Sequence, residues 1–208
     1  MIIKASHHFI IYNFFKIFTR LMLRRKFHSV VFDGKNIQTE KPILLIANHV
    51  SWWDGFWILY LNMKLFRKKF YFMMLEQQLK KFWFFKFSGG FSVHKSSKSI
   101  IETIHYTTEL LKDNNNLVLI FPQGEIKSMH QQEIRFEKGL ERIVTGAKNK
   151  IEIVMVVNLI DYFSNPKPTL YMYYQSFEYD MFHLSKFEES YQVFFNQCIQ
   201  KQLKLNRQ

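Results

Sequence analysis

The sequence predicts one α/β domain with a largely parallel or mixed central sheet flanked by helices, preceded by an N-terminal amphipathic helix on a membrane surface. Short apolar runs alternate along the chain with stretches of helical periodicity, which is typical of a sheet covered by helices. The length of 208 residues suits a single domain, and 48% hydrophobic residues supply a core. With only 7 Gly and 4 Pro, disordered and collagen-like classes are excluded.

The first predicted element is a helix over about residues 7–26. Polar side chains recur there at helical spacing, and large apolar residues fill most other positions; the polar set is Asn13, Lys16, Arg20 and Arg24. Such a helix is typical of a bilayer interface, and the alternative is an ordinary surface helix packed on the domain. We assign residues 1–30 to a membrane-interface segment and residues 31–208 to the α/β domain.

The remaining elements follow in order. Apolar runs predict strands at 43–47, 71–75, 91–93, 117–121 and 151–157, and a less regular alternation predicts one at 169–177. Helices are expected from about Trp52, over 76–87, from Ser97 or Ser99 to Leu111, over 138–147 and over 187–205. No run of 18 apolar residues predicts a spanning helix.

The charge pattern predicts an anionic, partly apolar partner. The net charge is +12, and residues 64–98 carry nine basic residues against one acid, Glu76. In this stretch four consecutive aromatics, residues 82–85, lie among lysines. On a helix they point in all directions, which favours a membrane over a nucleic-acid stacking groove. A core helix with solvated lysines is the alternative.

A candidate catalytic pair follows the strand at 43–47. His49 lies just past the end of that strand, where α/β folds place their ligands, and an imidazole has an ordinary pKa of about 6.5, which suits proton transfer. On a regular helix Asp54 would point away from it, but if His49 lies in a loop before the helix, the carboxylate reaches the imidazole and fixes its tautomer. The alternative is that Ser51 and Asp54 form only a capping box.

Four blocks in order resemble the glycerolipid acyltransferases, the family that includes 1-acylglycerol-3-phosphate acyltransferase. Asn48-His49-x4-Asp54 resembles that family's NHx4D box. The others are Gly89 to Lys95, similar to its glycine-to-arginine block; Phe121 to Glu125 with Phe136 to Gly139, similar to its FPEGT and FKKG boxes; and Ile153 to Val157, similar to its fourth block.

The resemblance implies acyl transfer from acyl-CoA or acyl carrier protein to a lipid hydroxyl or amine. His49 is then the general base, Asp54 orients it, and the thioester is attacked directly without an acyl-enzyme. The acceptor site is expected at Lys95, Gln123, Gly124 and Glu125. Backbone amides at the start of the helix after His49 are expected to help hold the oxyanion.

Departures from the family pattern bear on the acceptor. Gln123 replaces the glutamate of the FPEGT box, Ile126 the following arginine, and Lys95 another arginine, which removes a bidentate phosphate ligand. Lys127 offers a partial replacement. We therefore expect an acceptor other than a standard lysophosphatidate, such as a lyso-aminolipid.

The expected location is the cytoplasmic face of a membrane, in peripheral association. A single cysteine, Cys198, forms no intramolecular disulfide and indicates a reducing compartment. No histidine or cysteine spacing predicts a catalytic metal, and no glycine-rich loop predicts a nucleotide cofactor, so the acyl donor is the only co-substrate expected. A non-catalytic lipid-binding protein on the same scaffold is the main alternative, and a nucleic-acid-binding module is a weaker one that lacks any recognisable motif.

Overall fold

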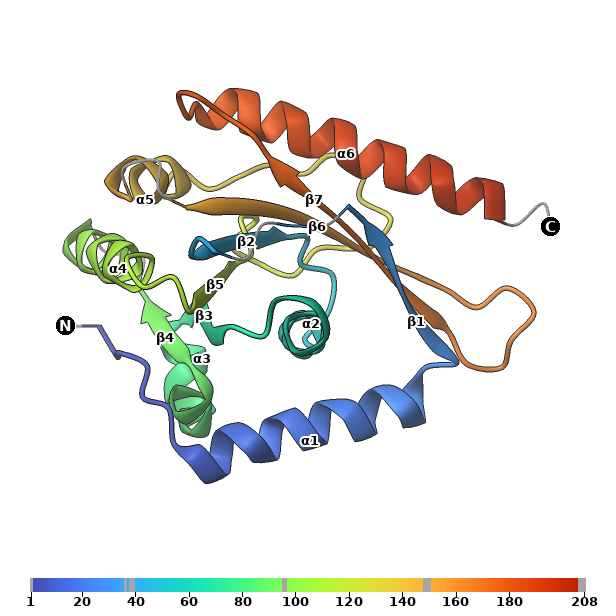
Figure 1. The fold of residues 1–208 in the computed structure, drawn as a ribbon, viewed down its shortest axis with the longest axis horizontal. Helices are drawn as coiled ribbons and strands as arrows, with labels where there is room; N and C mark the ends of the chain where they lie inside the picture. The colour runs from blue at the N-terminus through green and yellow to red at the C-terminus, as the bar shows by residue number, and fades with distance from the viewer. Residues whose placement is uncertain (1, 36, 38–39, 95–96, 148–150, 206–208) are drawn as a thin grey trace.

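The chain folds into one seven-stranded sheet with helices on both faces (Figure 1). The structure is a computed structural model that describes residues 2–35, 37, 40–94, 97–147 and 151–205. The strand order is β1-β7-β6-β2-β5-β3-β4, and all neighbours are parallel except β6 and β7. The predicted fold class, an α/β domain with a largely parallel mixed sheet, is confirmed.

The centre of the sheet carries the most apolar strands. β2 (Ile43–Ala47) lies between β5 (Asn116–Ile120) and β6 (Glu152–Asp161), and β2 and β5 are buried along their whole length. Alternate residues of β2 enter different cores: Leu44 and Ile46 face one, and Ile43, Leu45 and Ala47 face the other. Burial on both faces explains why these strands appear in the sequence as continuous apolar runs.

The outer strands complete the sheet. β3 (Lys69–Leu75) and β4 (Gly90–Val93) form one edge, and β7 (Thr169–Phe177) pairs antiparallel with β6 on the other side. β1 (Ser29–Gly34) is the outermost strand and was not predicted. Its apolar run, Val30 to Phe32, is only three residues long, and its side chains are exposed or half-buried.

The helices cover both faces. α1 (Phe9–Lys26) and α2 (Asp54–Leu61) pack on one face, and α4 (Ser97–Leu110), α5 (Leu140–Gly146) and α6 (Leu184–Leu205) lie over the other (Figure 1). A π-helix, η1 (Asn62–Phe66), extends α2 and ends at Arg67, whose φ of 57° is left-handed.

The prediction of one continuous helix over 76–87 is wrong, because the segment forms two shorter helices. α3 (Glu76–Lys81) ends before Phe82, whose φ of −111° and ψ of 55° are not helical, and a 3₁₀-helix, η2 (Trp83–Ser88), follows. The break places Phe85 in the core and leaves Trp83 63% exposed. A run of bulky aromatics has a low helix propensity, and packing of Phe85 decides the local geometry.

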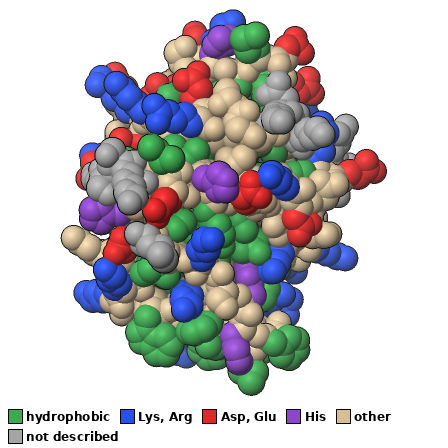
Figure 2. Space-filling model, turned by 90° about the vertical axis from the view of Figure 1, so that its left-hand side faces the viewer, with side chains coloured by type: hydrophobic (Ala, Val, Ile, Leu, Met, Phe, Trp, Pro, Cys, Tyr) green, Lys and Arg blue, Asp and Glu red, His purple; other side chains and the backbone are tan. Residues whose placement is uncertain are grey.

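The N-terminal helix divides its apolar residues between two sides. One side is buried against α2 and η2 through Phe15, Met22 and Leu23. The other is open to solvent, with large apolar side chains exposed by more than half: Phe9, Ile10, Phe14, Ile17 and Leu21. Figure 2 shows hydrophobic side chains gathered at the lower end of the molecule, with lysines and arginines nearby. Within the described chain, no helix has both the length and the hydropathy needed to cross a bilayer.

Candidate active site

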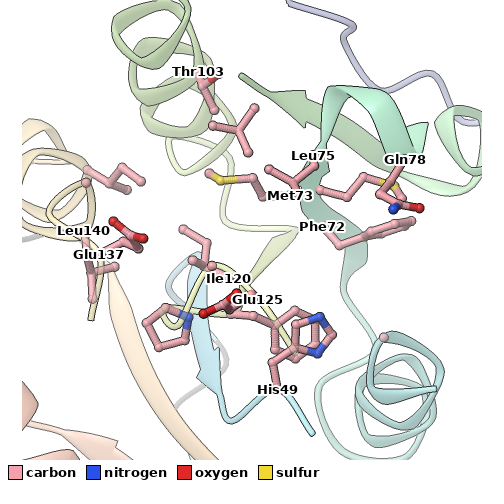
Figure 3. A pocket seen from close by; sticks show the side chains of 18 of the residues that line it. His49, Phe72, Met73, Leu75, Gln78, Thr103, Ile120, Glu125, Glu137 and Leu140 are labelled. Carbon is pink, nitrogen blue, oxygen red and sulfur yellow. The ribbon is translucent and has the colours of Figure 1, made fainter. Parts of the chain in front are cut away.

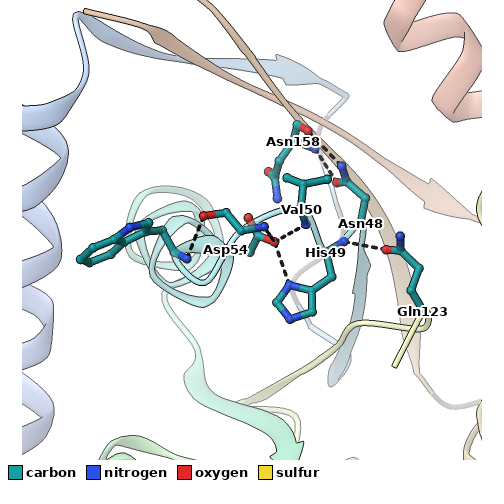
Figure 4. A network of polar contacts seen from close by, with 8 residues as sticks. Asn48, His49, Val50, Asp54, Gln123 and Asn158 are labelled. Carbon is teal, nitrogen blue, oxygen red and sulfur yellow. Dashed lines mark hydrogen bonds and ion pairs between the residues drawn. The ribbon is translucent and has the colours of Figure 1, made fainter. Parts of the chain in front are cut away.

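His49 lies in the loop that follows β2, at the carboxyl edge of the parallel strands. Asn48 anchors this loop to the neighbouring strand β6: its Nδ2 donates to the Asn158 carbonyl at 3.0 Å, and its Oδ1 accepts the Asn158 N–H at 2.8 Å (Figure 4). Both asparagines are buried. The reciprocal pair fixes where the chain leaves the sheet, and so where His49 begins.

Asp54 contacts His49 across this bend, as the sequence predicted for a loop histidine. Asp54 Oδ2 lies 2.8 Å from His49 Nδ1, and the same oxygen accepts the N–H groups of Val50 at 2.7 Å and Ser51 at 2.9 Å (Figure 4). Asp54 is therefore both the partner of the imidazole and a cap for the backbone before α2. Since an ionised carboxylate only accepts, Nδ1 carries the proton and Nε2 is left as the basic nitrogen.

The environment of Asp54 opposes its charge. Asp54 is fully buried, and burial raises its pKa above the usual range of an aspartate, although the hydrogen bonds from His49, Ser51 and Val50 act in the opposite direction. Its second oxygen, Oδ1, is buried and has no hydrogen-bond partner among the described residues. The carboxylate thus depends on the three donors at Oδ2 for its stabilisation.

The loop after β5 encloses His49 from the other side. The Phe121 ring stacks on the imidazole, with centroids 4.1 Å apart and planes 10° apart. Gln123 Oε1 accepts the His49 N–H at 2.6 Å, and the Lys127 N–H donates to the His49 carbonyl at 2.8 Å. Gly124 has a φ of 70°, and a Cβ there would lie 3.1 Å from Cγ of Glu137, so the turn requires a glycine.

A cavity of about 840 Å³ opens beside the imidazole (Figure 3). This volume is in the upper part of the usual range for ligand sites, about 300–1,000 Å³. Most of its lining side chains are apolar, among them Phe15, Phe56, Leu59, Phe70, Phe72 and Phe85. The charged lining residues other than His49 are Glu125, Glu137, Lys138 and Arg142.

The predicted acceptor residues are only partly brought together. Gly124 and Glu125 line the cavity, whereas Gln123 is not among its lining side chains and points to the His49 backbone. Lys95 lies outside the described residues. Lys127 forms an ion pair with Glu125. Glu137, in the FKKG-like block, was not predicted as a site residue; its side chain is exposed, and its carboxylate is directed into the cavity (Figure 3).

The backbone amides near the start of α2 are mostly engaged already. Those of Val50 and Ser51 bond Asp54 Oδ2, and that of Trp53 bonds Ser51 Oγ. These three backbone amides are therefore not free to bind an oxyanion, the role expected from the sequence for amides at the start of this helix. In the described part of the chain, no group of three or more His, Cys, Asp or Glu side chains is arranged to hold a metal ion.

Comparison with known proteins identifies the family of the chain. The family model described as Acyltransferase matches residues 29–158, which is more than half of the chain and includes His49, Asp54 and Gln123. No curated protein matches the chain. The chain belongs to the Acyltransferase family, which comprises the glycerolipid acyltransferases.

Proposed function

We propose that this protein transfers a fatty acyl group from acyl-CoA or acyl carrier protein to a hydroxyl or amine of a lysolipid, with His49 as the general base and Asp54 as its orienting partner. The observation that carries the proposal is the 2.8 Å contact between His49 Nδ1 and Asp54 Oδ2 at the wall of a largely apolar cavity. The contact leaves Nε2 available to accept a proton, and the cavity offers room for a lipid chain.

The proposed reaction needs no covalent enzyme intermediate. Nε2 of His49 takes the proton from the acceptor O–H or N–H while that atom attacks the thioester carbonyl carbon. The tetrahedral intermediate collapses with cleavage of the C–S bond, and the imidazolium returns the proton to the thiolate. An ester or amide and a free thiol result. Asp54 stabilises the imidazolium while it exists. The acyl donor is the only co-substrate in this scheme, and no metal or nucleotide cofactor takes part.

The charges in the cavity support an acceptor other than lysophosphatidate. Glu125 and Glu137 direct carboxylates into the space (Figure 3), and Lys138 and Arg142 are also among the lining residues. A phosphate monoester would have to lie near both carboxylates. A lysolipid with an ammonium group, or a neutral one with a free hydroxyl, fits this mixed set better.

Side-by-side turnover assays on lysophosphatidate and on lyso-aminolipids test the acceptor. We expect the aminolipid to be preferred, and Glu137→Gln to lower its turnover while leaving turnover of a neutral acceptor close to wild type. Glu133→Gln serves as the control, because Glu133 is exposed, pairs with Arg135 and does not line the cavity. A marked preference for lysophosphatidate contradicts the acceptor proposal.

We also propose that the protein works at the cytoplasmic face of a membrane, bound through the exposed side of α1. Phe14, one of the five exposed apolar residues of α1, stacks on Phe18 of the same helix. Phe18 in turn stacks on Trp53, which is 37% exposed. Trp52 is 46% exposed and also lines the cavity, so a bilayer meeting this surface would lie near the cavity wall. Basic residues at the end of the helix, Arg24, Arg25 and Lys26, suit anionic lipids.

Vesicle flotation tests the membrane proposal. We expect wild-type protein to float with anionic vesicles and Ile17→Glu/Leu21→Glu to stay in solution, because two charges would enter the apolar layer. Ile101→Glu is the control, since Ile101 is 60% exposed but belongs to α4 on the other face of the sheet. Equal flotation of all three proteins excludes α1 as the membrane-binding surface. Binding to oligonucleotides but not to vesicles at the same salt would favour a nucleic-acid partner.

The activity itself is tested with purified protein, vesicles containing lysolipids, and long-chain acyl-CoA or acyl carrier protein. We expect free thiol and acylated lipid to appear in equal amounts. Membrane binding without transfer from either donor would support the alternative, a non-catalytic lipid-binding protein. Lipid profiling of cells lacking the protein would identify the acceptor as the lysolipid that accumulates.

A further inference from the structure

The segment of residues 131–137 leads to the cavity wall but has no regular secondary structure. Its backbone polar groups therefore need partners from elsewhere in the chain. The helix α6 supplies several of these partners from two half-buried side chains, Glu188 and Gln192. The two residues are four positions apart, so they lie on the same face of the helix.

Three hydrogen bonds join these side chains to the segment. Glu188 Oε1 accepts the Phe136 N–H at 2.7 Å. Gln192 Oε1 accepts the Ile134 N–H at 2.9 Å, and Gln192 Nε2 donates to the Gln132 carbonyl at 2.8 Å. Every second residue from 132 to 136 is therefore tied to α6 through its backbone.

Packing holds the same segment against α6. The Phe136 ring makes T-shaped contacts with Phe187 and Tyr191, with centroids 5.6 Å and 5.3 Å apart, and both partners are fully buried. Ile134 is also buried in this core. The position of the segment is therefore set by α6 along most of its length.

The held segment ends at Glu137, on the wall of the cavity. The Glu137 N–H donates to the Pro122 carbonyl at 2.8 Å, and the carboxylate is directed into the cavity (Figure 3). Among the described residues, no side chain is hydrogen-bonded or ion-paired to this carboxylate. The placement of the Glu137 backbone therefore decides where its charge lies.

We propose that Glu188 and Gln192 are positioning residues that set the acceptor preference of this protein through Glu137. The proposal rests on the proposed function, in which the acceptor is a lysolipid with an ammonium group. A carboxylate held in place binds an ammonium group better than a mobile one, because less freedom is lost on binding. Neither Glu188 nor Gln192 lines the cavity, so both act through the segment that they hold.

Two substitutions of Glu188 test the hydrogen bond. Glu188→Ala removes the acceptor for the Phe136 N–H, and Glu188→Gln keeps an acceptor oxygen. We expect Glu188→Ala to lower kcat/KM for a lyso-aminolipid by about tenfold and to leave that for a neutral lysolipid within about threefold of wild type, because only the ammonium group contacts Glu137. The KM for the acyl donor should not change. Glu188→Gln should restore the wild-type preference.

A double-mutant cycle tests whether the effect passes through Glu137. We expect Glu188→Ala/Glu137→Gln to be no less active on the lyso-aminolipid than Glu137→Gln alone, because the charge that Glu188 positions is already absent. Gln192→Ala should behave like Glu188→Ala in the same cycle. Glu189→Ala is the matched control, since it removes the same charge from an exposed neighbouring position of α6.

Independent effects of Glu188→Ala and Glu137→Gln overturn the proposal, and so does an equal loss of activity with both acceptors. If Glu188→Ala does not fold, the cycle with Gln192→Ala decides. If wild-type protein acylates no lyso-aminolipid, the proposed acceptor fails, and amide hydrogen exchange tests the positioning alone. We then expect Glu188→Ala to speed exchange of the Glu137 amide, which is bonded to Pro122 and not to Glu188. Unchanged exchange overturns the proposal.

Discussion

Replacing Asp54 by asparagine should separate the charge of this residue from its orienting role. One oxygen, Oδ2, accepts all three donors, from His49 Nδ1 and from the N–H groups of Val50 and Ser51. An asparagine with its carbonyl oxygen at this position keeps all three hydrogen bonds and the same imidazole tautomer. The negative charge that stabilises the imidazolium is lost. The amide Nδ2 takes the buried place of Oδ1, which has no hydrogen-bond partner among the described residues, so the variant should also be less stable.

The size of this loss follows from the geometry. With Nδ1 and Oδ2 2.8 Å apart, the two charges are centred about 4 Å from each other, and their attraction is about 4 kcal/mol at an effective dielectric constant of about 20. If half of the imidazolium charge has developed in the transition state, the variant loses about 2 kcal/mol of transition-state stabilisation. A fully developed charge gives the upper limit, about 4 kcal/mol. At 1.36 kcal/mol per factor of ten, kcat should fall by about 30-fold to about 10³-fold.

Asp54→Ala should be more harmful than Asp54→Asn. It removes the orientation of His49 and leaves the partly buried N–H groups of Val50 and Ser51 without their acceptor, which costs at most about 1–3 kcal/mol for each group. The assay is thiol release from acyl-CoA with saturating lysolipid, combined with thermal melting of each variant. Equal kcat for the two variants, with both folded, would refute the separation of charge from orientation.

Three further predictions concern the base, the pH dependence of stability and the core. His49→Ala should lower the rate by about 10²–10⁴-fold, the usual contribution of a general base, and a rate within threefold of wild type would remove His49 from the mechanism. Because burial raises the pKa of Asp54, the folded protein holds this proton more tightly than the unfolded chain. The melting temperature of wild type, relative to that of Asp54→Asn, should therefore rise as the pH falls through the folded pKa of Asp54 toward the ordinary value of 3.8, and fall again as the pH rises. A difference between the two melting temperatures that stays constant across that range would contradict this prediction. Leu45→Ala, at a fully buried position of β2, should lower the free energy of unfolding by about 2–5 kcal/mol in urea titrations. A loss below about 1 kcal/mol would contradict this, because it would mean that the surrounding core fills the space left by the leucine side chain.

The fold was predictable where local pattern and final environment agree. Strands buried on both faces, such as β2 and β5, must be apolar throughout, so their sequences identify them. β1 was missed because it is an outer strand held by its pairing with β7, which is distant in sequence. The break at Phe82 was missed because the burial of Phe85 against other elements, and not local periodicity, decides it.

The site shows the same division. The sequence by itself determined the residue types: an imidazole and a carboxylate five positions apart after a buried strand, and a glycine-containing block after another. Only the tertiary structure decided that the carboxylate reaches the imidazole, that Gln123 turns to the His49 backbone, and that Glu137 enters the cavity. The reason is that strand neighbours and loop packing set these distances, and β2 and β5 lie side by side although about 70 residues separate them in the chain.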